Sequence, residues 1–360
     1  MSLKSYLQET YQNRLVLVTG HTGFKGSWLC AWLKLLGAKV IGVSLPLPDS
    51  KILFGEACIA DKMTSIYQDV CNYAAVQKVF NETQPEIVFH LASQSSVRLS
   101  YADPLTTYKT NVMGMTNVLE AARHCSSVKS VVIVTGDKCY QNREWEWGYR
   151  ETDALGGKDP FAASKACMEL VTASYQEGLF PLSEFPVRVA SARGGTVLGG
   201  GSWSEDRLVP GLIESLRLNK TITLRNPSAT RSWQHVLELL QGHLILGAKL
   251  SAENGEKFAC PWNLAPVNKN AITVHLLAKQ LAALWESNAD IQVISNTLPE
   301  PGFLHVDASK AEAILGWHSK LSIEKSLMLT VKWYKEYYNN PTAAGKLLNN
   351  QILDYQELMA

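Results

Sequence analysis

The sequence has no long apolar run and no excess of one charge, and both absences narrow the possible functions. No apolar stretch reaches the ~18 residues that span a bilayer, and the N-terminal MSLKSYLQETYQ lacks the apolar core of a signal peptide. The 34 Lys and Arg residues against 33 Asp and Glu residues leave a net charge of +1. This balance argues against a protein that coats nucleic acid or binds membranes through a basic surface. We therefore expect a cytoplasmic protein with neither kind of partner.

Cysteine clusters and internal repeats are also absent. The seven cysteines are scattered, without a CxxC pair or a neighbouring histidine cluster. His235 and His243 stand two helical turns apart, too far to share one ion. The sequence therefore predicts no metal site, and it predicts small buried cysteines in a reducing compartment.

What the chain does have is the composition of a globular enzyme and a regular alternation of strand and helix signals. Hydrophobic residues make up 46% of its 360 residues and charged residues 19%. Apolar, β-branched runs predict strands, and helical spacing recurs between them. The strands are expected at 15–19, 39–44, 87–91, 131–135 and 187–192, and the main helices at 27–36, 74–82, 104–123 and 161–175. This order predicts an α/β fold, a doubly wound parallel sheet of the Rossmann type.

The first predicted strand runs directly into the glycine loop GHTGFKG, residues 20–26. Gly20, Gly23 and Gly26 permit a tight turn and close approach of the backbone to a pyrophosphate. The following helix would point its free N–H groups at the phosphates. Since the loop lies at the first strand–helix junction, it predicts a dinucleotide site.

The residues at the ends of the next two strands do not identify the dinucleotide. The second strand ends at Ser44, where neither a carboxylate for a ribose 2′-hydroxyl nor an arginine for a 2′-phosphate is present. The residues alone therefore do not choose between NAD and NADP. A further strand is expected to end at Ile66. Asp69, which follows it, is either a ligand of the adenine amino group or a simple turn residue.

Several motifs together resemble those of extended short-chain dehydrogenases/reductases and, among them, the CDP-glucose 4,6-dehydratase branch. The motifs are GHTGFKGSWL at 20–29, HLA at 90–92, DKCY at 137–140, WGYRE at 147–151, SK at 164–165 and WQHVLE at 233–238. The resemblance covers residues 14–338. It implies a homodimer formed through helices 104–123 and 161–175, and NAD as the cofactor. The cofactor-binding residues that it implies are Gly20, Thr22, Gly23, Phe24, Lys25, Gly26, Asp69, Leu91, Ala92 and Lys165.

The resemblance also implies a reaction, the redox-neutral dehydration of a nucleotide-diphosphosugar, most closely of CDP-glucose to CDP-4-keto-6-deoxyglucose. Hydride would pass from C4 of the sugar to NAD and return to C6 after the C5 proton and the C6 hydroxyl are lost. Asp137 and Lys138 match the dehydration pair, and Lys165 completes the catalytic set. The expected substrate-binding residues are Arg98, Thr196, Arg207, Arg225 and Arg231. The guanidinium groups of Arg225 and Arg231 suit a diphosphate, and Thr196 can donate one hydrogen bond.

Two positions depart from the family pattern. The tyrosine of Tyr-x-x-x-Lys aligns with Phe161, and the Ser/Thr that precedes Asp-Lys aligns with Gly136. Thr135, beside Gly136, is expected to face the other side of its strand. Loss of a general base costs roughly 10²–10⁴-fold in rate.

Three explanations of this departure stay open. The chain is a slow or rewired enzyme, in which Lys138, His90 or a water supplies the base. Alternatively, it is a relative that binds NAD and a nucleotide-sugar without turnover. A sequence altered deliberately or by error is the third.

The pattern becomes less regular after residue 193, where five glycines fall between 194 and 201. We predict an NAD-binding domain over 1–192, to which 236–265 also belong. A nucleotide-sugar-binding domain is expected over 193–235 and 266–340. The polar segment 341–360 is expected to be a loosely held tail.

Overall fold

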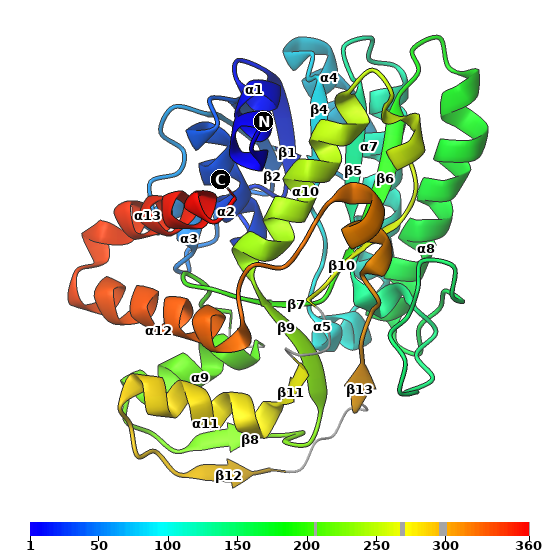
Figure 1. Ribbon diagram of the computed structural model, residues 1–360. Helices are drawn as coiled ribbons and strands as arrows, with labels where there is room; N and C mark the ends of the chain where they lie inside the picture. The colour runs from blue at the N-terminus through cyan, green and yellow to red at the C-terminus, as the bar shows by residue number, and fades with distance from the viewer. Residues whose placement is uncertain (205–206, 267–270, 295–300, 360) are drawn as a thin grey trace.

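The main sheet of this computed structural model is the parallel sheet that the sequence predicted. The structure describes residues 1–204, 207–266, 271–294 and 301–359. Within these residues seven parallel strands form one sheet, in the order β10-β6-β5-β4-β1-β2-β3 (Figure 1). They are β1 (Leu15–Thr19), β2 (Lys39–Ser44), β3 (Thr64–Tyr67), β4 (Ile87–His90), β5 (Ser130–Val134), β6 (Arg188–Gly194) and β10 (Trp262–Leu264). The order reverses at β1, the kind of switch point at which ligands bind in open α/β sheets.

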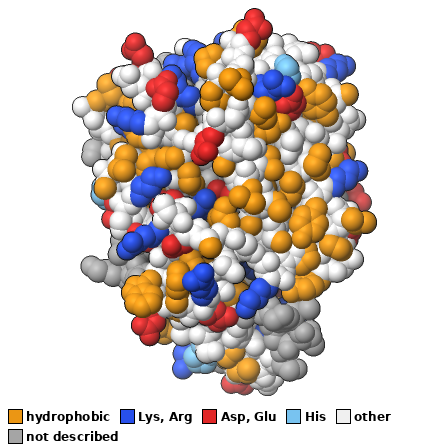
Figure 2. All heavy atoms as spheres, turned by 90° about the vertical axis from the view of Figure 1, so that its right-hand side faces the viewer, with side chains coloured by type: hydrophobic (Ala, Val, Ile, Leu, Met, Phe, Trp, Pro, Cys, Tyr) orange, Lys and Arg blue, Asp and Glu red, His pale blue; other side chains and the backbone are white. Residues whose placement is uncertain are grey.

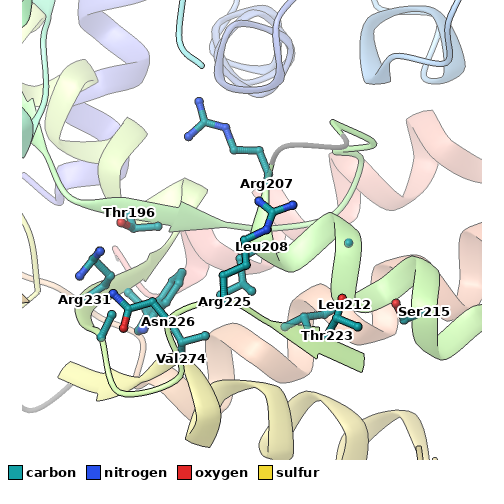
Figure 3. A pocket seen from close by; sticks show the side chains of 13 residues that line it. Thr196, Arg207, Leu208, Leu212, Ser215, Thr223, Arg225, Asn226, Arg231 and Val274 are labelled. Atoms are coloured by element: carbon teal, nitrogen blue, oxygen red, sulfur yellow. The ribbon is translucent and has the colours of Figure 1, made fainter. Parts of the chain in front are cut away.

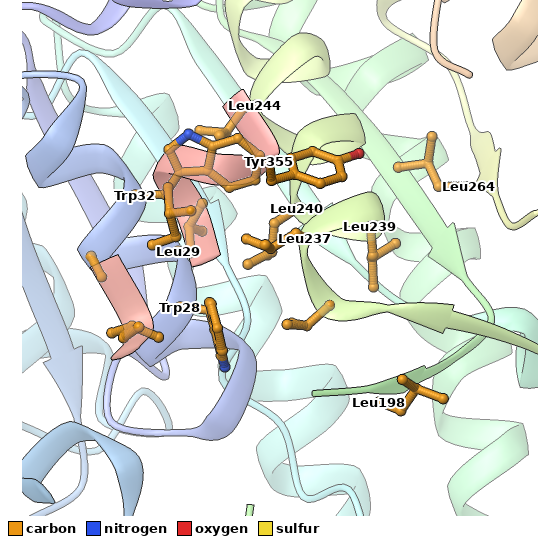
Figure 4. Packing of buried hydrophobic residues seen from close by; sticks show 14 of the residues in the cluster. Trp28, Leu29, Trp32, Leu198, Leu237, Leu239, Leu240, Leu244, Leu264 and Tyr355 are labelled. Atoms are coloured by element: carbon orange, nitrogen blue, oxygen red, sulfur yellow. The ribbon is translucent and has the colours of Figure 1, made fainter. Parts of the chain in front are cut away.

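Alternating side chains of each strand build two cores, one on each face of the sheet. On β1, Val16 and Val18 join one buried cluster and Leu17 joins the other. The first face is covered by α1 (Leu3–Tyr11), α2 (Phe24–Leu35) and α10 (Val236–Ser251), and the second by α4 (Tyr73–Thr83), α7 (Gly114–Arg123) and α8 (Pro160–Ser174). Figure 4 shows the first core, where Trp28 and Trp32 of α2 pack toward leucines of α10. This arrangement confirms the predicted fold class.

The long helix expected over 104–123 is interrupted by a wider turn. It consists of α6 (Pro104–Tyr108), the π-helix η1 (Lys109–Met113) and α7. Asn111, in η1, is buried, and its amide holds the loop that follows β4 by accepting from Gln94 N (2.7 Å) and Ser93 Oγ (2.9 Å). π-Bulges often mark functional sites. Here the bulge places a buried amide beside the predicted active site.

A smaller lobe lies below the sheet in Figure 1. Its central strand β9 (Thr230–His235) pairs with β7 (Thr196–Leu198), β11 (Ala271–Thr273) and β13 (Phe303–Leu304), while β8 (Ile222–Leu224) pairs with β12 (Ile291–Val293). Three helices pack on these strands, namely α9 (Leu208–Arg217), α11 (Val274–Trp285) and α12 (Ile323–Asn339). Short connections make up the remaining elements: α3 (Leu53–Glu56), α5 (Val97–Ala102), η2 (Asp137–Cys139), η3 (Tyr175–Leu179), η4 (Phe180–Leu182), η5 (Gly255–Phe258), η7 (Ala311–Leu315) and η8 (Pro341–Ala343).

The expectation of a loosely held C-terminal tail is wrong. The segment forms α13 (Ala344–Glu357), whose Ile352 and Tyr355 are buried in the first core. Tyr355 packs edge-on against Trp32 of α2, with ring centroids 5.6 Å apart. The polar composition hid this packing because only one stripe of the helix is apolar.

The described residues were expected to include no membrane-spanning helix, no metal site and no disulfide. In these ranges no helix combines the length and the apolar character needed to cross a bilayer. The same ranges contain no group of three His, Cys, Asp or Glu side chains arranged to hold a metal ion. All seven cysteines are free, and Cys30, Cys125 and Cys139 are buried, as expected, whereas Cys58 is exposed.

Candidate active site

The glycine loop is pressed against the end of β4. Gly20 has a φ of +70°, and a Cβ there would lie 2.7 Å from Ala92 N. A Cβ on Gly26 would lie 2.1 Å from Gly20 O, so no side chain fits at either position. The structure therefore brings Gly20, Gly26, Leu91 and Ala92 together, as the sequence predicted. Their binding roles stay predictions.

The first turn of α2 leaves its N–H groups available for an anion. Its N-cap is Gly23, which has no side chain to cap the helix. Thr22 and Ser44 hydrogen-bond to each other (2.9 Å) beside the loop. Open N–H groups, a positive helix end and a backbone without Cβ atoms fit a dinucleotide pyrophosphate.

Asp69 lies farther out on the same edge of the sheet. Its carboxylate is exposed and accepts a hydrogen bond from Cys71 N (2.9 Å). This contact is that of a turn residue. An adenine contact stays a prediction.

Asp137 and Lys138 lie in η2, the short turn that follows β5. Burial raises the pKa of Asp137, against the opposing effect of the Lys138 and Arg231 charges. Lys138 Nζ lies 5.8 Å from the centroid of the Phe161 ring, and Lys165 Nζ lies 5.7 Å from the same centroid. Two of the three predicted catalytic residues, Lys138 and Lys165, therefore lie beside one apolar ring.

Lys165 is buried on α8, with its ammonium directed at the loop after β4. Its Nζ donates to Ser93 Oγ (2.9 Å). Burial lowers the pKa of Lys165 to about 7, with a further contribution from Lys25, and burial lowers the pKa of Lys25 to about 8, assisted by Arg207. Three cations in mutual reach make this region strongly electropositive, as an anionic ligand requires.

Neither Gly136 nor Phe161 supplies a hydroxyl to this site. Gly136 has a φ of +141°, a conformation that side-chain-bearing residues rarely adopt. Phe161 occupies the first turn of α8, which Asp159 caps by accepting from Ala162 N (2.8 Å). The Thr135 hydroxyl is buried and donates to Glu169, so it is already committed within the protein.

His90 does not have the environment of a general base. It is fully buried, and its Nδ1 pairs with Thr19 Oγ1 (2.8 Å). Burial lowers its pKa to about 3, with a further contribution from Lys165. The imidazole is therefore neutral and enclosed, which argues against His90 as the base of a rewired enzyme.

A buried ion pair behind the site was missed by the sequence analysis. Arg193 on β6 and Glu169 on α8 are each 3% exposed and lie 2.8 Å apart. Glu169 also accepts from Thr135 and from Ser191 Oγ (2.6 Å), and Arg193 donates to Tyr140 Oη (2.8 Å). These contacts join α8 to the turn that carries Asp137. No local spacing signals this pair, because Glu169 and Arg193 lie on different elements.

The smaller lobe contains a cavity of about 400 Å³, and the charge of Arg231, one of its lining residues, acts on Asp137. Figure 3 shows Thr196, Arg207, Arg225 and Arg231 in its lining, together with apolar side chains of α9. Arg207 reaches the upper lobe, where it donates to Ser95 O (2.8 Å). Arg98, on α5, is not among the lining residues, so the structure brings together four of the five predicted substrate residues.

Comparison with known proteins identifies the family. The sequence profile described as GDP-mannose 4,6 dehydratase matches residues 17–330. The chain belongs to the GDP-mannose 4,6-dehydratase family. Within this family of dehydratases, CDP-glucose 4,6-dehydratase of Salmonella typhimurium (strain LT2) is 42% identical over 331 residues, which cover 91% of this chain and 92% of that protein.

Solved structures share the fold of this GDP-mannose 4,6-dehydratase family member. UDP-glucose 4-epimerase of Thermus thermophilus, in complex with NAD, is 25% identical, has a TM-score of 0.75 and matches 89% of this chain and 98% of that one. dTDP-glucose 4,6-dehydratase of Bacillus anthracis str. Ames, also in complex with NAD, is 21% identical, has a TM-score of 0.76 and matches 91% and 98% of the two chains. At 21% identity, the second likeness concerns the fold alone.

Proposed function

We propose that this protein is an NAD-dependent dehydratase of a nucleotide-diphosphosugar and that it converts CDP-glucose to CDP-4-keto-6-deoxyglucose. The observation that carries the proposal is the position of the Asp137–Lys138 turn. Lys138 shares the Phe161 ring with Lys165, and Asp137 is within electrostatic reach of Lys25 in the glycine loop and of Arg231 in the cavity lining, so one sugar can reach both. The 42% identical relative named CDP-glucose 4,6-dehydratase supports the choice of substrate.

The glycine loop and the residues around it fit NAD. The backbone of Gly20–Gly26 and the first turn of α2 would hold the pyrophosphate, and Lys165 would hold the nicotinamide ribose hydroxyls. When bound, NAD supplies a hydride acceptor and donor beside the sugar. Lys25 and Lys165 add positive charge beside the bound phosphates.

The turn after β5 would carry out the dehydration. Because burial raises the pKa of Asp137, its carboxyl group retains a proton more readily and can protonate the C6 hydroxyl as it leaves. Lys138 would take the C5 proton. The two groups are neighbours on one turn, and C5 and C6 are neighbouring atoms of the sugar.

Removal of the proton from O4 of the sugar should be slow in this protein, because the expected base is missing. Phe161 stands four residues before Lys165 and presents a phenyl ring to both lysines where the family tyrosine is expected. Without a phenol at this position, we expect slow turnover. The same ring favours a second candidate function, a protein that binds NAD and the nucleotide-sugar without turnover.

An assay of the purified protein with NAD and CDP-glucose separates the two candidates. A 4-keto-sugar gives an absorbance in alkali, and the proposal predicts this signal at high enzyme concentration over hours. Binding of CDP-glucose without the signal would support the second candidate. Failure to bind CDP-glucose would contradict both.

An exposed apolar face on α6 and α8 supports a homodimer. Leu105 is 81% exposed and Leu170 60% exposed, and Tyr108 and Met113 are exposed nearby in the chain. Figure 2 shows hydrophobic side chains gathered on the side of the molecule that carries α8. Patches of this kind mark protein interfaces. Sedimentation should show a dimer, and Leu105→Glu with Leu170→Glu should yield monomers, whereas a monomeric wild-type protein would contradict the proposal.

A further inference from the structure

The arginines of the cavity differ in how much of their hydrogen-bonding capacity the protein already uses. Arg207 donates to Ser95 O, and Arg231 donates to Thr230 O (2.8 Å) and Pro301 O (2.7 Å). Arg225 follows β8, and its guanidinium has no hydrogen-bond or ion-pair partner among the residues that the structure describes. It is therefore a cavity donor whose N–H groups are available for a ligand.

Arg207 and Arg231 also lie closer to the catalytic groups. Burial is the largest cause of the lowered pKa of Lys25, and the charge of Arg207 is the second. Burial raises the pKa of Asp137, whereas the charges of Lys138 and, less strongly, Arg231 act to lower it. Arg225, which follows β8, makes no hydrogen bond to the upper lobe among the described residues. A sugar diphosphate with its hexose at the Asp137 turn would thus place its phosphates at Arg207 and Arg231 and its base at Arg225.

The surroundings of Arg225 suit a flat ring. Leu208 and Leu212, one turn apart on α9, and Val274, at the start of α11, give the cavity apolar walls. In Figure 3 the Arg225 side chain rises from the end of β8 toward the start of α9, beside Leu208. A base packed against these walls would present its edge, and not its face, to the guanidinium.

The edge of the base decides which nucleotide fits. Cytosine presents two adjacent acceptors, O2 and N3, and an arginine fork donates two parallel N–H bonds that match them. Uracil and thymine carry a proton on N3, so the second donor of the fork would meet another donor. We propose that Arg225 reads the O2–N3 edge of cytosine and makes the cavity selective for CDP over UDP. This inference rests on the proposed function, which places a nucleotide-sugar in the cavity.

Calorimetric titration of CDP and UDP tests the assignment, because the two nucleotides share the same diphosphate. The wild-type protein should bind CDP at least about ten-fold more tightly than UDP, the size expected of a bidentate contact to a base edge. Arg225→Lys keeps the charge but loses the fork, so CDP affinity should fall about ten-fold while UDP affinity stays nearly constant. Arg225→Met should abolish the preference as well. Arg217→Lys is the matched control, since Arg217 pairs with Glu214 on α9 and does not line the cavity.

The outcomes distinguish this inference from the proposed function. Equal weakening of both nucleotides by Arg225→Lys would assign Arg225 to the diphosphate and overturn base reading. A wild-type protein that binds both nucleotides equally would overturn it without any variant. A wild-type protein that binds neither would contradict the proposed function itself.

Discussion

Arg193 and Arg225 show how differently the two lobes use the same side chain. Arg193 is buried on β6 of the main sheet, and it donates to Glu169, to Tyr140 and to the Glu151 carbonyl. Arg225 lines the cavity of the smaller lobe without a partner among the described residues. A buried charge must be paired within the protein, whereas a charge left unpaired in a cavity is available to a ligand. The paired arginine holds the main lobe in shape, and the unpaired one is the residue that we propose selects the nucleotide.

Breaking the buried pair should have the largest effect. Glu169→Ala leaves Arg193 buried without its carboxylate and frees Thr135 and Ser191. We expect the free energy of unfolding to fall by about 3–5 kcal/mol, measured by urea denaturation. Glu286→Ala, which removes an exposed partner of Lys335, should have no measurable effect. Equal losses in both variants would mean that the buried pair is no more important than a surface contact.

Restoring a phenol should have the next largest effect. Phe161→Tyr places a hydroxyl near Lys138 and Lys165, and we expect formation of the 4-keto-sugar to rise about 100-fold. Gly136→Ser should not be combined with it, because the φ of +141° at Gly136 would strain a serine. Phe303→Tyr on β13 is the control. No rise in Phe161→Tyr would show that the phenol is not the missing group.

A substitution in the glycine loop should have a smaller effect, and it tests the proposed NAD site directly. Gly26→Ala forces a Cβ against Gly20 O, so the loop must open, and NAD affinity should fall at least about ten-fold in a fluorescence titration. Gly55→Ala, in α3, is the matched control because no atom lies within 4 Å of its added Cβ. If both variants bind NAD as the wild-type protein does, the loop is not the pyrophosphate site.

A change of pH should have the smallest effect. Lys165, with its pKa lowered to about 7, and Lys25, with its pKa lowered to about 8, lose their protons as the pH rises from 6 to 9. NAD affinity should therefore decrease roughly three-fold over this range. The contribution of Lys165 to stability has the opposite sign: above pH 7 the unfolded chain binds more protons than the folded one, so this contribution increases with pH. An affinity that rises toward pH 9 would contradict the account.

The sequence predicted the parts of the molecule that depend on local pattern. Apolar runs predicted the strands of the main sheet except β10, the glycine loop follows the first of them, and four of the five predicted substrate residues line one cavity. Which arginine is paired and which is free could not be predicted, because Glu169 and Arg193 are distant in sequence and meet only through the packing of α8 on β6. The packing of α13 could not be predicted either, because its single apolar stripe contacts α2, which lies near the other end of the chain.

The most direct test of the central claim is the mass of the product formed from CDP-glucose in deuterated water, with NAD and stoichiometric protein. The account predicts a product that has lost one water and gained one deuterium, because the C5 proton is removed by the protein and replaced from solvent. CDP-glucose recovered with unchanged mass after binding would contradict dehydration and leave a nucleotide-sugar-binding protein in its place.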